Sequence, residues 1–390
     1  MRAHATLPIA ALALAELLVW AGLYYLFPAL LLRWEGAFGW SRGTLTATFT
    51  LSLLIAAASA PLFGRLVDRG HGRQVLAGGA AAGALLLLAL TWVESPWAFA
   101  VVWACIGLCL GACLYEPTFA LVTRAREGAA RDIALITLVA GFAGTLGFPA
   151  AAVLSDLGDW RFAAYAFAAA ILVVAVPLFW WAAGRLGSGG ASAPKVTRPV
   201  RGHLRTLHFW LLAASFPALA LCHGIVIAHL LPILDERGVA QATALAAIAA
   251  IGPMQVVGRV LLLAVARRAS SRALALSAFA AMAAAPLLLA VGGTSALLLF
   301  LFAGLQGMAM GATTILRPAI AADLLGRGAF GTLSGTLAVP YLAAAALAPM
   351  IGTVLWSVGG YDLVLVAMAA LVALGAAAFL GALRRASGSG

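Results

Sequence analysis

Six ionisable side chains stand inside long apolar runs of this sequence, where a charge is costly unless it has a function. A carboxyl or an imidazole group in such surroundings can take up and release a proton. A guanidinium group is a planar fork that binds a carboxylate through two hydrogen bonds. These residue types therefore predict proton transfer and anion recognition. The six residues are Glu16, Glu116, His223, His229, Arg259 and Arg317.

Glu16 and Glu116 are the two candidate proton carriers, and His223 is a third group that titrates near neutral pH. Glu16, Trp20 and Tyr24 follow one another at four-residue spacing, so they share one face of a helix. We expect this face to line a cavity. The alternative for His223 is a polar residue that only packs.

Glu116 and Arg317 each stand directly before a proline, about 200 residues apart. An arginine within a membrane costs at least about 2.5 kcal/mol, and a carboxylate partner would lower that cost. One hypothesis is a charge pair between two halves of the chain that a ligand or a proton breaks. The alternative is a static salt bridge.

Arg259 follows Gln255 by one helical turn and is the candidate anchor for an anionic ligand. The alternative places Arg259 near a helix end, where it would close a gate as the counterpart of Arg65. Further residues share the helix faces that we expect to line the same cavity. They are Tyr24, Cys109, Cys113, Glu116, Gln306, Met310, Thr313 and Arg317.

Several kinds of chemistry are missing from the sequence. No His, Cys, Asp or Glu cluster has metal-ligand spacing, so we expect neither a metal ion nor another cofactor. No catalytic triad or nucleotide-binding loop is recognisable, which argues against an enzyme. The four cysteines lie in apolar runs and are expected to fill the core. The net charge of +11 resides in short loops, so it does not indicate a nucleic-acid partner.

The composition indicates an all-α membrane protein. The 390 residues are 64% hydrophobic and 9% charged, and the mean hydropathy is +1.06. Apolar runs of about 20 residues are long enough to cross a bilayer as helices. We expect twelve spans, near residues 7–32, 43–64, 75–93, 97–122, 132–155, 162–183, 207–234, 242–265, 273–291, 296–322, 330–356 and 363–383.

The positive charges predict how the spans are oriented. Eighteen Lys and Arg residues lie on the side that holds both termini, against four on the other side. Because positive loops stay in the cytoplasm, we expect a multi-pass protein of the cell inner membrane with both termini cytoplasmic.

Two similar halves make up the sequence. Gly107-Leu-Cys-Leu-Gly111 parallels Gly307-Met-Ala-Met-Gly311, and Asp159 parallels Asp362. A stretch rich in Gly, Ser, Pro and cations separates the halves and has the composition of a flexible linker. We therefore expect two pseudo-symmetric six-helix bundles, residues 1–183 and 207–390, joined by a cytoplasmic linker at 184–206.

A short charged loop between the second and third spans carries the clearest motif. Its residues run Gly64-Arg-Leu-Val-Asp68-Arg69-Gly-His-Gly-Arg73. The pattern resembles the loop between helices 2 and 3 of the major facilitator superfamily. This resemblance implies a secondary transporter of twelve helices, in which spans 1, 4, 7 and 10 line a central cavity. It also implies a gating loop, in which Asp68 faces the positive N-terminus of span 11 near Arg124.

A second segment indicates a narrower resemblance. Glu35-Gly-Ala-Phe-Gly-Trp40, preceded by Phe27-Pro28, is similar to the signature of the monocarboxylate transporter family. That family moves small organic anions together with protons and anchors the carboxylate on an arginine of span 8. Arg259 is the position that matches, whereas Ala29 stands where the family often has a lysine.

Three functions follow as hypotheses. The first is proton-coupled transport of a small organic anion, with Arg259, Arg317, Tyr24, Gln306, Gln255 and His229 around the substrate. The second is a proton-driven exporter of lipophilic or cationic compounds, which the acids Glu16 and Glu116 would suit. The third is a membrane scaffold or sensor, which no recognisable signalling domain supports. The expected partners are the substrate, protons and the lipid bilayer, and the protein is expected to be a monomer.

Overall fold

The computed structural model describes residues 2–126, 129–187, 200–266, 268–292, 294–327 and 329–387. These residues form helices joined by short turns, and no strand occurs among them. Most of the expected linker, residues 188–199, lies outside the described part. At its two ends, residues 184–187 complete one helix and residues 200–204 form another.

Ten α-helices occupy the described residues of the first half of the chain. Two π-helical stretches, Trp20–Tyr25 and Ile171–Ala175, lie within the first and sixth spans. The helices are α1 (Arg2–Val19), α2 (Leu26–Phe38), α3 (Arg42–Asp68), α4 (Gly72–Leu90), α5 (Pro96–Cys113), α6 (Tyr115–Ala125), α7 (Ala129–Ala140), α8 (Ala143–Leu157), α9 (Trp160–Ala170) and α10 (Val176–Gly187).

The second half contains the remaining six helices. They are α11 (Val200–Leu204), α12 (Leu207–Glu236), α13 (Gln241–Val265), α14 (Ser271–Gly292), α15 (Ala296–Leu325) and α16 (Phe330–Ser387). In α16 the backbone leaves helical geometry at Gly359 and Gly360, and Gly360 takes a φ of +67° that favours glycine. The break divides α16 into two spans.

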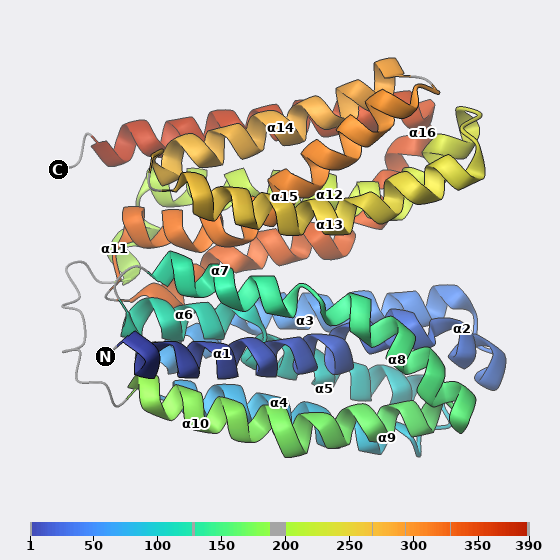
Figure 1. Ribbon diagram of the computed structural model, residues 1–390, viewed down its shortest axis with the longest axis vertical. Helices are drawn as coiled ribbons and strands as arrows, with labels where there is room; N and C mark the ends of the chain where they lie inside the picture. Colours follow the sequence, from blue (N-terminus) through green and yellow to red (C-terminus); the bar gives the residue numbers. More distant parts are fainter. Residues whose placement is uncertain are drawn as a thin grey trace. The chain divides into compact units, whose positions relative to one another are not determined.

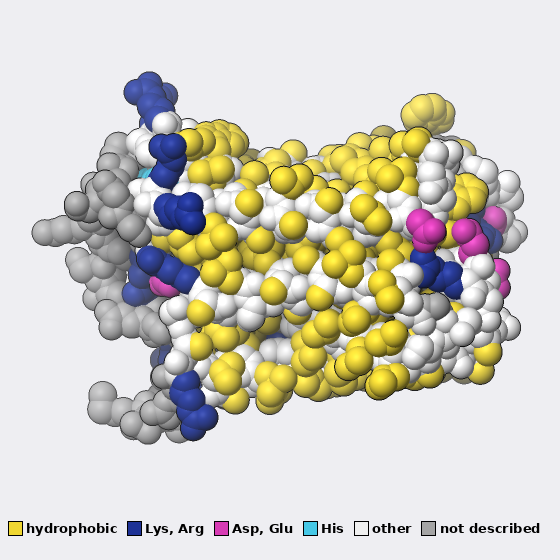
Figure 2. Space-filling view, turned by 90° about the horizontal axis from the view of Figure 1, so that it is seen from above, with side chains coloured by type: hydrophobic (Ala, Val, Ile, Leu, Met, Phe, Trp, Pro, Cys, Tyr) yellow, Lys and Arg dark blue, Asp and Glu magenta, His cyan; other side chains and the backbone are white. Residues whose placement is uncertain are grey.

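Eleven continuous helical segments in the described part are long and apolar enough to cross a membrane. Since α16 supplies two spans, the structure agrees with the twelve that the sequence predicts. The surface also has the pattern of a membrane protein, as Figure 2 shows on one face. Hydrophobic side chains cover the middle of the helices there, and charged side chains lie at the two ends, most of the Lys and Arg at one end and the visible Asp and Glu mainly at the other.

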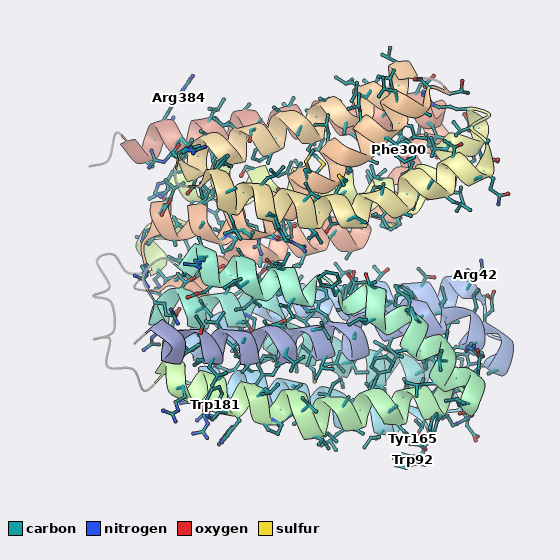
Figure 3. All side chains as sticks on the ribbon, in the orientation of Figure 1. Arg42, Trp92, Tyr165, Trp181, Phe300 and Arg384 are labelled. Atoms are coloured by element: carbon teal, nitrogen blue, oxygen red, sulfur yellow. The ribbon has the colours of Figure 1, made fainter. Side chains whose placement is uncertain are left out.

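Exposed aromatic side chains mark the two ends of the spans. Trp92 and Tyr165 project from the helices of the first half towards one end, and Trp181 projects towards the other (Figure 3). Trp and Tyr concentrate at membrane–water interfaces because their rings are apolar and carry one polar group. Their positions therefore match the edges of a bilayer.

Contacts divide the chain into two compact units. Unit 1 holds residues 1–197 and 326–339, and unit 2 holds residues 198–325 and 340–390. The start of α16 thus packs with unit 1, while its continuation belongs to unit 2. In unit 1, α1 lies between α7 and α10, and α10 packs on α4 (Figure 1).

The repeated glycines have the same role in both units. A Cβ on Gly107 of α5 would lie 2.3 Å from the backbone oxygen of Ser52 on α3. A Cβ on Gly307 of α15 would lie 2.5 Å from the backbone oxygen of Ile251 on α13. Only glycine allows backbones to approach so closely. The internal repeat of the sequence therefore corresponds to a repeated helix crossing.

The segment that resembles the monocarboxylate transporter signature packs within unit 1. Phe27 stacks on Phe49 with ring centres 4.5 Å apart, and Phe38 stacks on Trp40 at 4.2 Å. Gly39 ends α2 with a φ of +67°. The aromatic residues and glycine of the segment shape the turn between α2 and α3, so packing alone accounts for them.

Candidate functional site

Glu16 is completely buried in unit 1. Its Oε1 accepts a hydrogen bond of 2.5 Å from Oγ1 of Thr118 on α6. The indole of Trp20 lies beside the carboxyl group, but Oε2 is in hydrogen-bond geometry with no described residue. A buried carboxyl with one bonded and one open oxygen can hold a proton on the open oxygen, because the neutral form leaves no charge in the core.

A wall of aromatic rings follows Glu16 along the first span. Trp20 begins the π-helical stretch, which is a feature often found at functional sites. The ring centre of Trp20 lies 4.9 Å from that of Tyr24 and 4.7 Å from that of Tyr115 on α6. Tyr24 and Trp20 are both half-buried. The expected association of Glu16, Trp20 and Tyr24 is therefore present, with Tyr115 added to it.

The fourth span is broken at Leu114, two residues before Glu116. Leu114 is extended, with φ −91° and ψ −164°, between the end of α5 and the start of α6. Pro117 explains the break, because in a continuous helix its ring would clash with the carbonyl group of Cys113. Proline is tolerated in the first turn of a new helix, where it stands here. Glu116 consequently lies in the first turn of α6, where the helix dipole favours a negative charge.

The two cysteines expected on the face of Glu116 are placed differently. A Cβ on Gly79 of α4 would lie 3.3 Å from the Cβ of Cys113, and one on Gly83 would lie 3.4 Å from that of Cys109. Both cysteines therefore pack against α4. The expected face shared by Cys109, Cys113 and Glu116 requires one continuous helix. Because the helix is broken at Leu114, Glu116 does not continue the face of the two cysteines.

Arg317 is the buried cation of α15, with 8% of its surface exposed. Its guanidinium carbon lies 4.5 Å from the ring centre of Tyr341 on α16, which is a cation–π contact. Arg259 on α13 is also buried, with 5% exposed. Both arginines belong to unit 2. Glu116 belongs to unit 1, so its pairing with Arg317 stays a prediction.

The depths of the two arginines follow from the glycine crossing. Gly307 meets Ile251 and Gly311 meets Gln255, whereas Gly258 meets Met308, so α13 and α15 run in the same direction with an offset of 50 to 56 residues. By this offset, Arg259 lies level with a residue two to eight positions before Arg317. At 1.5 Å per residue, the two backbones differ in depth by about 3 to 12 Å. Unit 2 therefore carries two buried guanidinium groups on neighbouring helices.

Polar residues of unit 2 accompany the arginines. Gln306 on α15 is completely buried beside the thiol group of Cys222, and neither its amide oxygen nor its amide nitrogen is in full hydrogen-bond geometry with a described residue. His223 on α12 likewise has a buried Nδ1 without a described partner. Gln255 is half-buried on α13. Buried polar atoms are normally bonded, so these positions favour a bound water or ligand.

His229 lies apart from this group. Its Nε2 is 2.9 Å from the backbone oxygen of Pro349 on α16, and its ring centre lies 6.1 Å from that of Tyr361. His229 and His223 are six residues apart on α12, so they do not share a face. His229 therefore has a packing contact of its own.

The charged loop binds the start of α16 within unit 1. Oδ1 of Asp68 accepts a hydrogen bond of 2.8 Å from the backbone N–H of Gly331. Oδ2 accepts bonds of 2.7 Å from the N–H and the hydroxyl group of Thr332. Arg124 donates to the backbone oxygens of Val67 and Asp68. The contact of Asp68 with the start of α16 is the one that the resemblance implies, whereas Arg124 binds backbone oxygens and not the carboxylate. The role of Asp68 in gating stays a prediction.

The other loop residues have separate positions. A Cβ on Gly64 would lie 1.9 Å from the backbone oxygen of Gly331, so this glycine lets α3 and α16 touch. The guanidinium carbon of Arg73 stacks 3.6 Å above the ring of Trp180 on α10. Arg69 is exposed after the end of α3. The loop therefore contacts α16 through Gly64 and Asp68, and α10 through Arg73.

Four residues beside these sites were missed in the sequence, namely Thr118, Tyr115, Trp180 and Tyr341. Only Thr118 and Tyr115 had a signal, since both flank the Glu116-Pro117 pair that starts α6. Among the described residues, no group of three or more His, Cys, Asp and Glu side chains is placed to hold a metal ion.

Solved structures of known proteins resemble this chain in fold, but they do not identify its substrate. The E. coli fucose:proton symporter FucP is similar in structure, with a TM-score of 0.71 and 17% identity over 96% of this chain and 98% of that chain. A bacterial homologue of the iron transporter ferroportin gives 0.71 and 15% over 97% and 99%. The human organic anion transporter MFSD10 gives 0.67 and 18% over 96% and 98%. At these identities the likeness shows the fold alone.

The sequence itself matches one family model. The match to the Major Facilitator Superfamily covers residues 12–296, and no curated protein matches. Most of the chain lies in the matched range, and the solved structures share its fold over nearly their whole length. The chain therefore belongs to the Major Facilitator Superfamily and is a multi-pass membrane transporter.

Proposed function

We propose that the protein is a secondary active transporter that moves a small organic anion, resembling a monocarboxylate, across the cell inner membrane by alternating access. Protons drive the transport as symport. Both termini face the cytoplasm, in keeping with the excess of Lys and Arg at that end of the spans. The moving parts are the halves 1–183 and 207–390 with the linker 184–206, and the transporter works as a monomer.

The buried arginines of unit 2 are the observation that carries this proposal. Arg259 and Arg317 lie on two neighbouring helices, and little of either side chain is exposed. Guanidinium groups held in an apolar medium bind carboxylates more strongly than in water, because little water competes. Gln306 adds a buried amide group beside Cys222. Gln255 on α13 is proposed to complete the contacts of unit 2 with the substrate.

Glu16 is the proposed proton carrier. One oxygen of its fully buried carboxyl group accepts a hydrogen bond from Thr118, and the other oxygen has no hydrogen bond with a described residue. Binding a proton removes the buried negative charge. Protonation is therefore coupled to any movement of α1 that changes the burial of this carboxyl group. Glu116, in the first turn of α6, and His223, on α12, are the other candidate carriers.

The alternative is a proton-driven exporter of lipophilic cations. The aromatic rings of Trp20, Tyr24 and Tyr115 beside Glu16 favour it, because ring faces and a carboxylate both attract cations. This cluster belongs to unit 1, whereas the arginines belong to unit 2. The two candidate functions therefore rest on different residues and are separable by mutation.

A binding screen separates them. The purified full-length protein is titrated with lactate, pyruvate, oxalate and a lipophilic cationic dye, and thermal unfolding is followed. The proposal expects a carboxylate to raise the unfolding temperature of the wild type and of R268Q, an exposed control. It expects R259Q to lose this shift. Stabilisation by the dye alone, unaffected by R259Q, would favour the exporter.

A further inference from the structure

A groove of about 230 Å³ runs between α12 and the second part of α16 in unit 2. Its walls are apolar and consist mostly of small side chains. Ala214, Ala218 and Leu221 line it from α12, and Leu374, Gly375 and Ala378 line it from α16. No ionisable side chain lines it. Water needs two to four polar partners to occupy such a space, so an apolar chain is the fitting occupant.

Small residues create the groove because they let the two helices approach closely. A Cβ on Gly375 would lie 2.7 Å from the Cβ of Ala218 and 2.8 Å from the backbone oxygen of Ser215. Leu374 is 68% exposed, and Ala214 is exposed as well. The groove thus opens outward along membrane-spanning helices, where lipid is the surrounding medium.

Positive charge lies beyond one end of the groove. Gly375 is opposite Ser215, and Gly381 is opposite Leu211, so α12 and α16 run antiparallel here. Continuing this register brings Arg384 and Arg385 beside the first turn of α12. Arg384 is six residues beyond the groove residue Ala378, which corresponds to about 9 Å along a helix.

The two arginines are available to a ligand. Both are exposed, and Figure 3 shows Arg384 projecting from the end of α16. No carboxylate of the described residues forms an ion pair with either one. The N-terminus of α12 adds the positive end of a helix dipole. Trp210, in the same turn and 55% exposed, is a residue typical of the bilayer interface.

We propose that this surface is a binding site for an anionic phospholipid. One acyl chain fills the groove between α12 and α16, and the phosphate group is held by Arg384, Arg385 and the first backbone N–H groups of α12. The distance from the groove to the arginines matches a chain that lies within the bilayer and a headgroup at its surface. Bound lipid joins the two helices and stabilises unit 2.

The test is lipid titration of the full-length, delipidated protein, with binding counted by native mass spectrometry. Phosphatidylglycerol is compared with phosphatidylcholine of the same chains. Each cation near a membrane surface contributes about 1 kcal/mol, so two arginines correspond to a preference of roughly 30-fold for phosphatidylglycerol. The double variant R384Q/R385Q is expected to lose this preference, and the exposed control R268Q to keep it.

A second pair of variants tests the groove. A378F fills it and is expected to weaken binding of both lipids, whereas A377F changes an exposed neighbour on the same helix and leaves binding unchanged. Equal binding of the two lipids to the wild type would overturn the headgroup site. Unchanged binding to A378F and A377F would overturn the acyl-chain groove.

Discussion

Thr332 gives Asp68 two hydrogen bonds of 2.7 Å, one from its backbone N–H and one from its hydroxyl group. The carboxylate thus occupies the N-terminal end of α16, where the helix leaves N–H groups without partners of their own. A third bond comes from Gly331. This contact is one reason why residues 326–339, at the start of α16, pack with unit 1.

Asparagine at position 68 is expected to release the start of α16. The D68N change removes the charge and replaces one acceptor oxygen by a donor, which costs about 2 kcal/mol and raises local opening roughly 30-fold. Hydrogen exchange of the Gly331 and Thr332 amides measures it. D156N, which breaks the exposed pair with Arg33, is the control. Unchanged exchange in D68N would show that the contact contributes little.

Alanine at position 64 is expected to separate α3 from α16. Its Cβ would lie 1.9 Å from the backbone oxygen of Gly331, so one helix must shift. G64A should raise exchange of the same amides as D68N and lower the transport rate. G78A changes a glycine of α4 with no atom within 4 Å of its Cβ, and should leave both unchanged. Equal behaviour of the two variants would contradict the close contact.

Glutamine at position 16 is expected to abolish proton coupling. E16Q keeps an acceptor for the Thr118 hydroxyl group but cannot release a proton, so uptake driven by a pH gradient should fall at least about tenfold. Exchange of substrate across the membrane without a gradient should persist. E35Q, at the exposed pair with Arg42, serves as the control. Gradient-driven uptake by E16Q would assign the proton to Glu116 or His223.

The contact between Arg317 and Tyr341 is expected to depend on the aromatic ring. A double-mutant cycle of R317M with Y341L should give a coupling energy of about 1–2 kcal/mol in thermal unfolding, and the cycle with Y341F should give almost none, because phenylalanine keeps the ring face. The guanidinium carbon is 4.5 Å from the ring centre. Equal coupling in the two cycles would mean that the ring face is not the source of the interaction.

Asp159 should make stability depend on acid pH. Partial burial raises the pKa of its carboxyl group, but hydrogen bonds from Arg161 and from the N–H groups of Phe162 and Arg161 outweigh burial and hold the pKa below its usual value. The contribution is therefore complete above the unfolded pKa of about 3.9 and is lost as the pH falls through the folded pKa.

The matching measurement is the unfolding temperature of the wild type and D159A between pH 3 and pH 7. Asp159 caps α9, and loss of such a cap costs about 1 kcal/mol at neutral pH. The difference between the two proteins should shrink only at the acid end of the range. A difference that stays constant down to pH 3 would exclude the carboxylate as its source.

Periodicity and length predicted the spans well, because a bilayer demands long apolar helices whatever their neighbours are. The contact of the charged loop with the start of α16 was also expected from its motif, since few residues other than Gly64 and Asp68 allow this local geometry. The break at Leu114 was not predicted. The break arises because the ring of Pro117 would clash with the carbonyl group one turn earlier in a continuous helix. A continuous apolar run gives no sign of such a break.

The sequence does not show which residues pair with the buried charged groups. Thr118 lies 102 residues from Glu16, and Tyr341 follows Arg317 on another helix. Neither pair has a local spacing, since tertiary packing alone brings the residues together. The same holds for the cysteines of α5, whose expected face depended on a helix that does not continue.

Uptake of a labelled monocarboxylate into proteoliposomes under an inward proton gradient tests the central claim most directly. Wild type, R259Q and the exposed control R268Q are compared at equal protein density. Recognition of an anion by buried arginines predicts gradient-driven uptake in the wild type and R268Q, and a loss of at least about tenfold in R259Q. Uptake by R259Q at the wild-type rate, or accumulation of a cationic dye in place of any carboxylate, would contradict it.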